Sequence, residues 1–187
     1  MIGLESLRWL LTVAFGSTAV FHLLRCLRPA AAEHRVSETL HLVMGLSMIV
    51  MIWPGGEIVP MPAWIAVFAM STGWFVARTV WATRHRAAPA FFATAMATMV
   101  WMGASMPAPA SAAMAGMEHT RIGYAGWCSA LLGVYLVLAA LWWAGRGMRV
   151  GGLSTATAAA VSRPLGWSAL CHAVMSAGMG VALLAMM

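Results

Sequence analysis

Apolar residues are concentrated in six long runs that short polar stretches separate. Runs of about 20 apolar residues mark membrane-spanning helices. Such runs lie at approximately residues 7–28, 37–53, 63–83, 89–106, 124–144 and 164–186. The pattern predicts an all-α polytopic membrane protein, a six-transmembrane-helix bundle that forms one domain over residues 1–187.

Composition agrees with a membrane environment. The chain is 62% hydrophobic and only 9% charged, and its mean hydropathy is +0.84. A soluble domain is about 45–50% apolar and about 25% charged. The lipid bilayer is therefore the first partner that the sequence predicts, and the plasma membrane of a bacterium the expected location.

Arginine is the only strong base in the chain, and its positions predict the topology. Nine of the eleven arginines flank the connections after the first, third and fifth runs: Arg25, Arg28, Arg35, Arg78, Arg84, Arg86, Arg146, Arg149 and Arg163. Arg8 and Arg121 lie on the other side. By the positive-inside rule, both termini are outside and three connections are cytoplasmic. The basic charge then reflects topology, and nucleic acid is not an expected partner.

Several residue types that enzymes depend on are missing. The sequence contains no Asp, Asn, Gln or Lys. This removes Asp–Mg²⁺ phosphoryl transfer, lysine Schiff bases and Asp- or Asn-assisted triads. We therefore do not expect an enzyme.

Three segments share one spacing of nitrogen and sulfur donors. They are His41-x2-Met44-x3-Met48, His172-x2-Met175-x3-Met179 and Met99-x2-Met102-x3-Met106. Offsets of 0, 3 and 7 fall within about 60° on a helix, so each segment places its donors on one face. Imidazole and thioether together suit Cu(I). The spacing predicts a copper(I) site whose ligands come from these segments.

The order of these donors along the helices suggests a path for an ion. His22, His41 and His172 fall in the predicted inner half of their spans, and the methionines follow outward. We include His22 among the ligands. A ladder of weak thioether sites lets an ion enter and also leave, as conduction requires. Glu38 precedes His41 by three residues, near enough to orient its ring.

The positions of the three segments also suggest internal repeats. They occupy the second, fourth and sixth spans, which all run from inside to outside, so the chain is expected to contain three repeated helix hairpins. His34 and His85 lie among arginines near the connections and are expected to be solvated.

Two other interpretations of the same residues remain open. Methionine is a flexible filler of apolar cores, so the Met-rich faces could pack against partners in a structural or assembly subunit. Alternatively, two of His22, His41 and His172 could ligate a single b-type haem. Copper transport, or delivery to a membrane or extracytoplasmic partner, is the leading hypothesis.

The six spans, the early His22 and the two His-x2-Met-x3-Met helices resemble a family of small actinobacterial integral membrane proteins of unknown function. The resemblance covers nearly the whole chain and includes the His41–Met48 segment. It implies the six-span fold and no established activity. Function therefore depends on the residues themselves.

Overall fold

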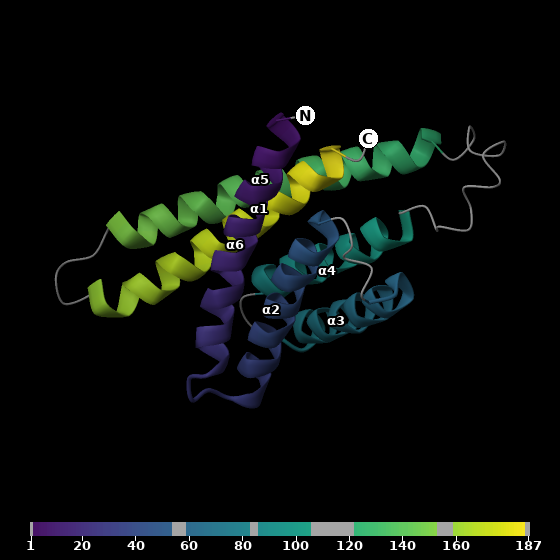
Figure 1. Ribbon diagram of the computed structural model, residues 1–187. Coiled ribbons are helices and arrows are strands. Elements are labelled where there is room, and N and C mark those ends of the chain that lie inside the picture. The colour runs from purple at the N-terminus through teal and green to yellow at the C-terminus, as the bar shows by residue number, and fades with distance from the viewer. Residues whose placement is uncertain (1, 54–58, 83–85, 106–121, 153–158, 186–187) are drawn as a thin grey trace. The chain divides into compact units, whose positions relative to one another are not determined.

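The computed structural model describes residues 2–53, 59–82, 86–105, 122–152 and 159–185, and in these ranges every regular element is a helix. The helices are α1 (Ile2–Cys26), α2 (Ala32–Ile52), α3 (Met61–Trp81), α4 (Ala87–Ser105), α5 (Ile122–Gly152) and α6 (Ala159–Ala185) (Figure 1). The predicted all-α class is confirmed for this part of the chain.

All six helices are long and apolar enough to cross a membrane. Four of them extend beyond the predicted spans by five residues or more. The helices α1, α2 and α6 begin at Ile2, Ala32 and Ala159 rather than at 7, 37 and 164, and α5 continues to Gly152 rather than ending at 144. Hydropathy locates the apolar stretch, whereas a helix continues into polar sequence until something breaks it. In α5 the guanidinium of Arg146 lies 5.5 Å from the ring centre of Trp142, a cation–π contact one turn away.

The chain divides into two compact units. The first comprises residues 1–54 and 133–186, and the second residues 55–132 with residue 187. The prediction of a single domain therefore stays a prediction. In the second unit α3 packs along α4, and Trp101 Nε1 on α4 donates a hydrogen bond of 3.0 Å to Ser129 Oγ at the start of α5.

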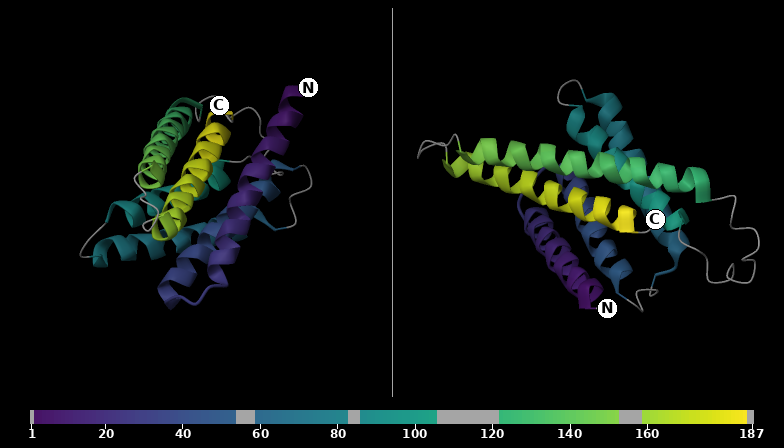
Figure 2. Two further views of the ribbon diagram at one scale, coloured as in Figure 1. Left: turned by 90° about the vertical axis from the view of Figure 1, so that its left-hand side faces the viewer. Right: turned by 90° about the horizontal axis from the view of Figure 1, so that it is seen from above.

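In the first unit α1 packs against both α2 and α6 (Figure 2). Phe15 lies where the three helices meet and is 1% exposed. A Cβ added at Gly178 of α6 would overlap the Phe15 ring, and one added at Gly45 of α2 would lie 3.5 Å from Ala19 Cβ. The two glycines therefore allow α1 to approach α2 and α6 closely, as small residues do in membrane helix pairs.

Two further contacts fix the first unit. At the end of α2, Trp53 Nε1 donates a 3.0 Å hydrogen bond to Thr12 Oγ1 of α1. Glycines also bring α5 onto α6, since a Cβ on Gly180 would lie 3.0 Å from the carbonyl oxygen of Gly133. Adjacent helices thus pair as α1 with α2, α3 with α4, and α5 with α6, while repetition of the hairpins stays a prediction.

Candidate functional site

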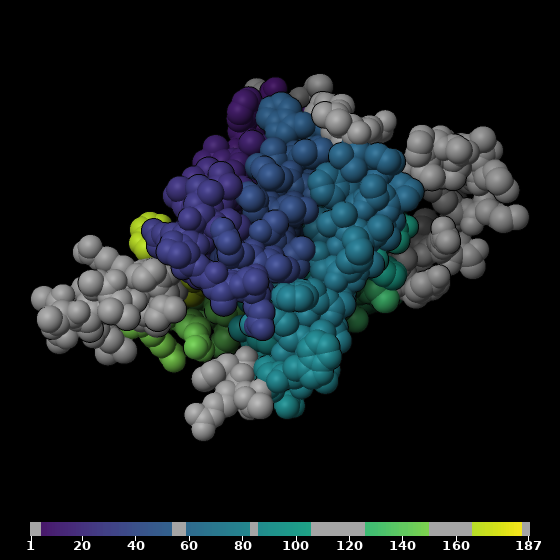
Figure 3. Space-filling model, turned by 90° about the horizontal axis from the view of Figure 1, so that it is seen from below, coloured from purple at the N-terminus to yellow at the C-terminus, as the bar shows by residue number. Residues whose placement is uncertain are grey.

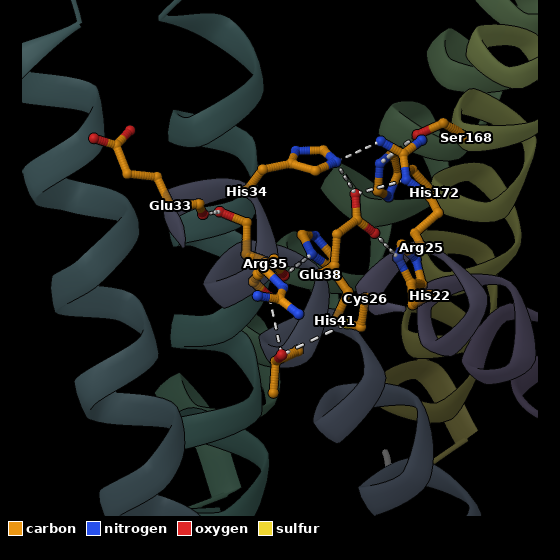
Figure 4. Close-up of polar contacts among 12 residues, drawn as sticks. His22, Arg25, Cys26, Glu33, His34, Arg35, Glu38, His41, Ser168 and His172 are labelled. Carbon is orange, nitrogen blue, oxygen red and sulfur yellow. Dashed lines mark hydrogen bonds and ion pairs between the residues drawn. The ribbon is translucent and has the colours of Figure 1, made fainter. Parts of the chain in front are cut away.

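Three buried histidines from three different helices meet in the first unit. The ring centres of His22 and His41 are 5.0 Å apart, those of His41 and His172 are 5.1 Å apart, and those of His22 and His172 are 5.7 Å apart. The exposed fractions are 1% for His22, 3% for His41 and 9% for His172. We call this group the histidine cluster (Figure 4).

Helical spacing explains why these rings are buried. On α1 the buried residues are Phe15, Thr18, Ala19 and His22, which follow the i, i+3, i+4, i+7 pattern of a single helix face. That face packs on α2 and α6, so it carries His22 into the centre of the unit. The sequence predicted His22, His41 and His172 as ligands, and the structure brings these three side chains together.

A carboxylate orients the His22 ring. Its Nδ1 lies 2.6 Å from Glu38 Oε2, so the ring donates its Nδ1 proton to the carboxylate. In a neutral imidazole the lone pair is then on Nε2. This Nε2 is buried and has no hydrogen-bond partner in the part of the chain that the structure describes. Carboxylate–histidine pairs of this kind prepare imidazoles as metal ligands.

The Glu38 contact differs from the expected one. The expectation was that Glu38 would orient His41 on its own helix, but its hydrogen bond goes to His22 on α1. His41 Nδ1 instead donates to the carbonyl oxygen of Ser37 at 2.6 Å, one turn earlier. The lone pair of neutral His41 is therefore also on Nε2. Sequence proximity alone could not indicate this contact, because His22 reaches Glu38 through the packing of α1 on α2.

His172 has a polar and an aromatic neighbour. Its Nε2 lies 3.3 Å from Ser168 Oγ, one helical turn earlier. The indole of Trp143 on α5 lies beside it, with ring centres 5.2 Å apart. The wall of the histidine cluster on this side is therefore aromatic.

A polar group that sequence reasoning missed lies beside the histidine cluster. Glu38 Oε1 accepts from Arg25 Nε at 2.9 Å and lies 3.1 Å from His34 Nε2. Arg25 Nη2 lies 2.8 Å from the same nitrogen of His34. The His34–Glu38 spacing of four residues is a signal in the sequence. The contribution of Arg25, which comes from α1, leaves no such signal in the sequence. His85 lies outside the described residues.

The methionines that follow the two histidines are also buried. Met44 and Met48 on α2 are 3% and 2% exposed, and Met175 and Met179 on α6 are 2% and 1% exposed. All four belong to the first unit. They therefore share a compact core with the histidine cluster, as the ladder requires.

The third predicted segment is not placed beside the other two. Met99 and Met102 are 1% and 3% exposed, but they belong to the second unit. Met106 lies outside the described residues. The convergence of this segment with the ladders of α2 and α6 stays a prediction.

The three imidazole rings are neighbours, with centres 5.0–5.7 Å apart, but their nitrogens do not point to a common position. Within the described ranges, no group of three or more His, Cys, Asp or Glu side chains is positioned to hold a metal ion. The His22 and His41 rings are nearly parallel, at 16°. Binding an ion would require rotation of these rings, or thioether ligands in addition to imidazole.

Comparison with known proteins gives one match. The family described as a domain of unknown function (DUF5134) matches residues 33–186. No curated protein and no solved structure matches the chain. The matched range includes α2 from its second residue and the whole of α6, with His41 and His172, and begins after His22.

Proposed function

The chain belongs to the DUF5134 family of domains of unknown function, and we propose that it binds copper(I) within the membrane through the histidine cluster and its methionines. One observation carries the proposal: three buried imidazoles from α1, α2 and α6 meet, and the Nε2 lone pair of His22 is buried without a hydrogen-bond partner among the described residues. A buried polar atom without a partner costs free energy, so an uncompensated one indicates a function.

The spacing of the rings suits a shared ion. Two imidazole nitrogens at about 2.0 Å from one ion, separated by a tetrahedral angle, leave the ring centres about 5 Å apart. The three observed separations are 5.0, 5.1 and 5.7 Å. We propose that the His41 and His172 rings rotate about their side-chain bonds when an ion binds, while the hydrogen bond of Glu38 holds the His22 ring in place.

The charge of the site favours a monovalent, soft ion. Imidazole and thioether are neutral ligands, and the one carboxylate that touches the cluster, Glu38, is paired with Arg25 at 2.9 Å. The site therefore offers little negative charge to offset the desolvation of a divalent ion. Soft nitrogen and sulfur donors select Cu(I) over harder ions.

The two other interpretations explain the geometry less well. A packing role in an assembly subunit accounts for the buried methionines. It does not account for the buried His22 nitrogen, because an apolar side chain would fill the same space without the cost of burying a polar atom. A b-type haem needs its macrocycle between two imidazoles, whereas the near-parallel His22 and His41 rings have centres only 5.0 Å apart, which leaves no room for a macrocycle between them. The absorption spectrum of the purified protein tests the haem, because a bound haem gives a Soret band.

We further propose how the protein is placed and used. The arginine distribution orients it with both termini outside, in the plasma membrane of a bacterium. The methionines of α2 and α6 then lead from the outer side to the histidine cluster. An ion passing along them would be conducted, or handed to a membrane or extracytoplasmic partner, and no chemical reaction is required.

Metal analysis of the detergent-purified chain tests the proposal. We expect about one Cu(I) per wild-type chain, and at least about tenfold weaker binding in the His41→Ala/His172→Ala variant, a loss of about 1.4 kcal/mol. Equal copper content in the two proteins would refute copper binding by the cluster.

A pair of conservative variants separates ligation from packing. Leucine conserves the volume of methionine and costs less than about 1.5 kcal/mol of stability. Met44→Leu/Met175→Leu should therefore fold normally and bind copper more weakly. Met148→Leu is the matched control, because Met148 is 67% exposed and outside the ladders. If the ladder variant binds copper as the control does, the methionines are packing residues.

A further inference from the structure

Arg25, His34 and Glu38 form a second group of polar side chains, between the histidine cluster and the end of the unit that carries the α1–α2 connection. Residues 27–31 of the connection are exposed, and Figure 3 shows the indigo part of the chain that includes them at the surface. Exposure falls inward along the contacts of this group, from 45% for the His34 side chain to 9% for Glu38 and 1% for His22. These residues therefore form a continuous polar route from the surface to the histidine cluster.

Glu38 uses its two oxygens in two directions. Oε2 accepts from His22 in the cluster at 2.6 Å, whereas Oε1 faces Arg25 and His34 on the more exposed side. An ion that moves from the cluster to this surface would pass from Glu38 Oε2, which is bonded to His22, to Glu38 Oε1, which is bonded to Arg25.

The guanidinium of Arg25 contacts two atoms, Glu38 Oε1 and His34 Nε2, that are of the types that bind metal ions. Its Nε lies 2.9 Å from Glu38 Oε1 and its Nη2 lies 2.8 Å from His34 Nε2, and these two acceptor atoms are 3.1 Å apart. Arginine only donates, so the Arg25 contact suits the His34 tautomer whose proton is on Nδ1 and whose Nε2 accepts; the other tautomer would instead donate from Nε2 to Glu38 Oε1 at 3.1 Å. In the first tautomer, the lone pair of Nε2 is available to a metal ion when Arg25 leaves. Imidazole lone pairs and carboxylate oxygens are metal ligands.

We infer that Glu38 Oε1 and His34 Nε2 form a second cation site, which the guanidinium of Arg25 fills and which an ion occupies on its way between the histidine cluster and the α1–α2 end. The inference rests on the proposed function. Arg25 is 22% exposed at the last turn of α1, so its long side chain can move into solvent and leave both acceptors to the ion. A site of only two ligands is weak, as passage of an ion requires.

Removal of the arginine charge tests this site. The probe is Ag(I), a redox-inert substitute for Cu(I), added to the full chain in chloride-free detergent solution. We expect Arg25→Gln to bind about one more Ag(I) per chain than the wild type, since glutamine keeps a donor for Glu38 without filling the site with charge. His34→Ala in the Arg25→Gln background should remove the additional ion.

Arg28→Gln is the matched control, because Arg28 is exposed, follows Arg25 by three residues and has the same charge. It should bind the same number of Ag(I) ions as the wild type. If Arg25→Gln binds no more than Arg28→Gln, or if His34→Ala leaves the additional ion in place, the second site is refuted. A wild-type chain that binds no Ag(I) would instead refute the histidine cluster.

A second measurement decides the question if Arg25→Gln does not fold. His34 is 45% exposed, so His34→Ala should leave the fold intact. We expect it to slow the transfer of bound Ag(I) to a chelator in solution about tenfold, equivalent to about 1.4 kcal/mol in the barrier. A transfer rate equal to that of the wild type would overturn the inference.

Discussion

Replacement of Glu38 by leucine removes the carboxylate that joins α1 to α2 through His22 and Arg25. Glu38 is 7% exposed, and its oxygens lie 2.6 Å from His22 Nδ1 and 2.9 Å from Arg25 Nε. Without it, the buried N–H of His22 loses its acceptor, which costs about 1–3 kcal/mol. The Arg25 guanidinium also loses its partner, although partial exposure reduces that cost.

The expected total is about 2–4 kcal/mol, near the lower end of what breaking a buried ion pair costs. For a chain of this length 1 kcal/mol shifts the melting temperature by about 2–4 °C. Thermal unfolding of the detergent-purified protein should therefore show a decrease of about 4–16 °C for Glu38→Leu. Glu33→Leu, at an exposed position on the same helix, is the control and should change stability by less than about 0.5 kcal/mol.

A double-mutant cycle isolates the ion pair from the rest of the effect. Arg25→Leu alone leaves a buried carboxylate without its cation, whereas Glu38→Leu/Arg25→Leu leaves neither charge. The double variant should be more stable than the sum of the single effects predicts, by at least about 1 kcal/mol. If the effects add within about 0.5 kcal/mol, or if Glu38→Leu melts with the Glu33→Leu control, the reasoning about this pair is refuted.

Two further predictions concern the packing of the first unit. Gly178→Ala should destabilise the protein by about 1–3 kcal/mol, because its Cβ would overlap the Phe15 ring. The control is Gly16→Ala, whose Cβ would meet nothing within 4 Å and which should be neutral or stabilising by up to about 1 kcal/mol. Equal melting temperatures for the two variants would contradict the packing argument. Trp53→Phe removes the hydrogen bond to Thr12 and should cost about 1 kcal/mol in the same assay, and Thr12→Val should give no additional loss in the Trp53→Phe background if that bond is the cause.

Much of the fold could be predicted from hydropathy alone. Six helices long enough to span a membrane follow from apolar runs, because the bilayer sets the length of each run and requires every backbone group to be bonded within its own helix. The predicted helix ends are less accurate: α1, α2 and α6 each begin five residues earlier than predicted, and α5 ends eight residues later. Polar residues such as Arg35 and Arg146 can continue a helix at the membrane surface, where water and headgroups solvate them.

The candidate site was only partly predictable. Periodicity places His41 and Met44 on one face of α2, but it cannot say which partner that face meets. Glu38 shows the limit: its spacing from His41 suggested a contact within the helix, and the structure gives its hydrogen bond to His22 on α1. Local spacing is known from sequence, whereas the choice between competing neighbours depends on how two helices cross.

Six apolar helices suited to a bilayer, and the nitrogen and sulfur donors that they carry, follow from the order of the residues, because bilayer thickness and helical geometry act on each segment alone. The meeting of His22, His41 and His172, and the reach of Arg25 to both Glu38 and His34, follow from how the helices pack. These contacts join residues from separate helices. They depend on close approach at Gly45 and Gly178, where the absence of a side chain lets α1 pack against both neighbours.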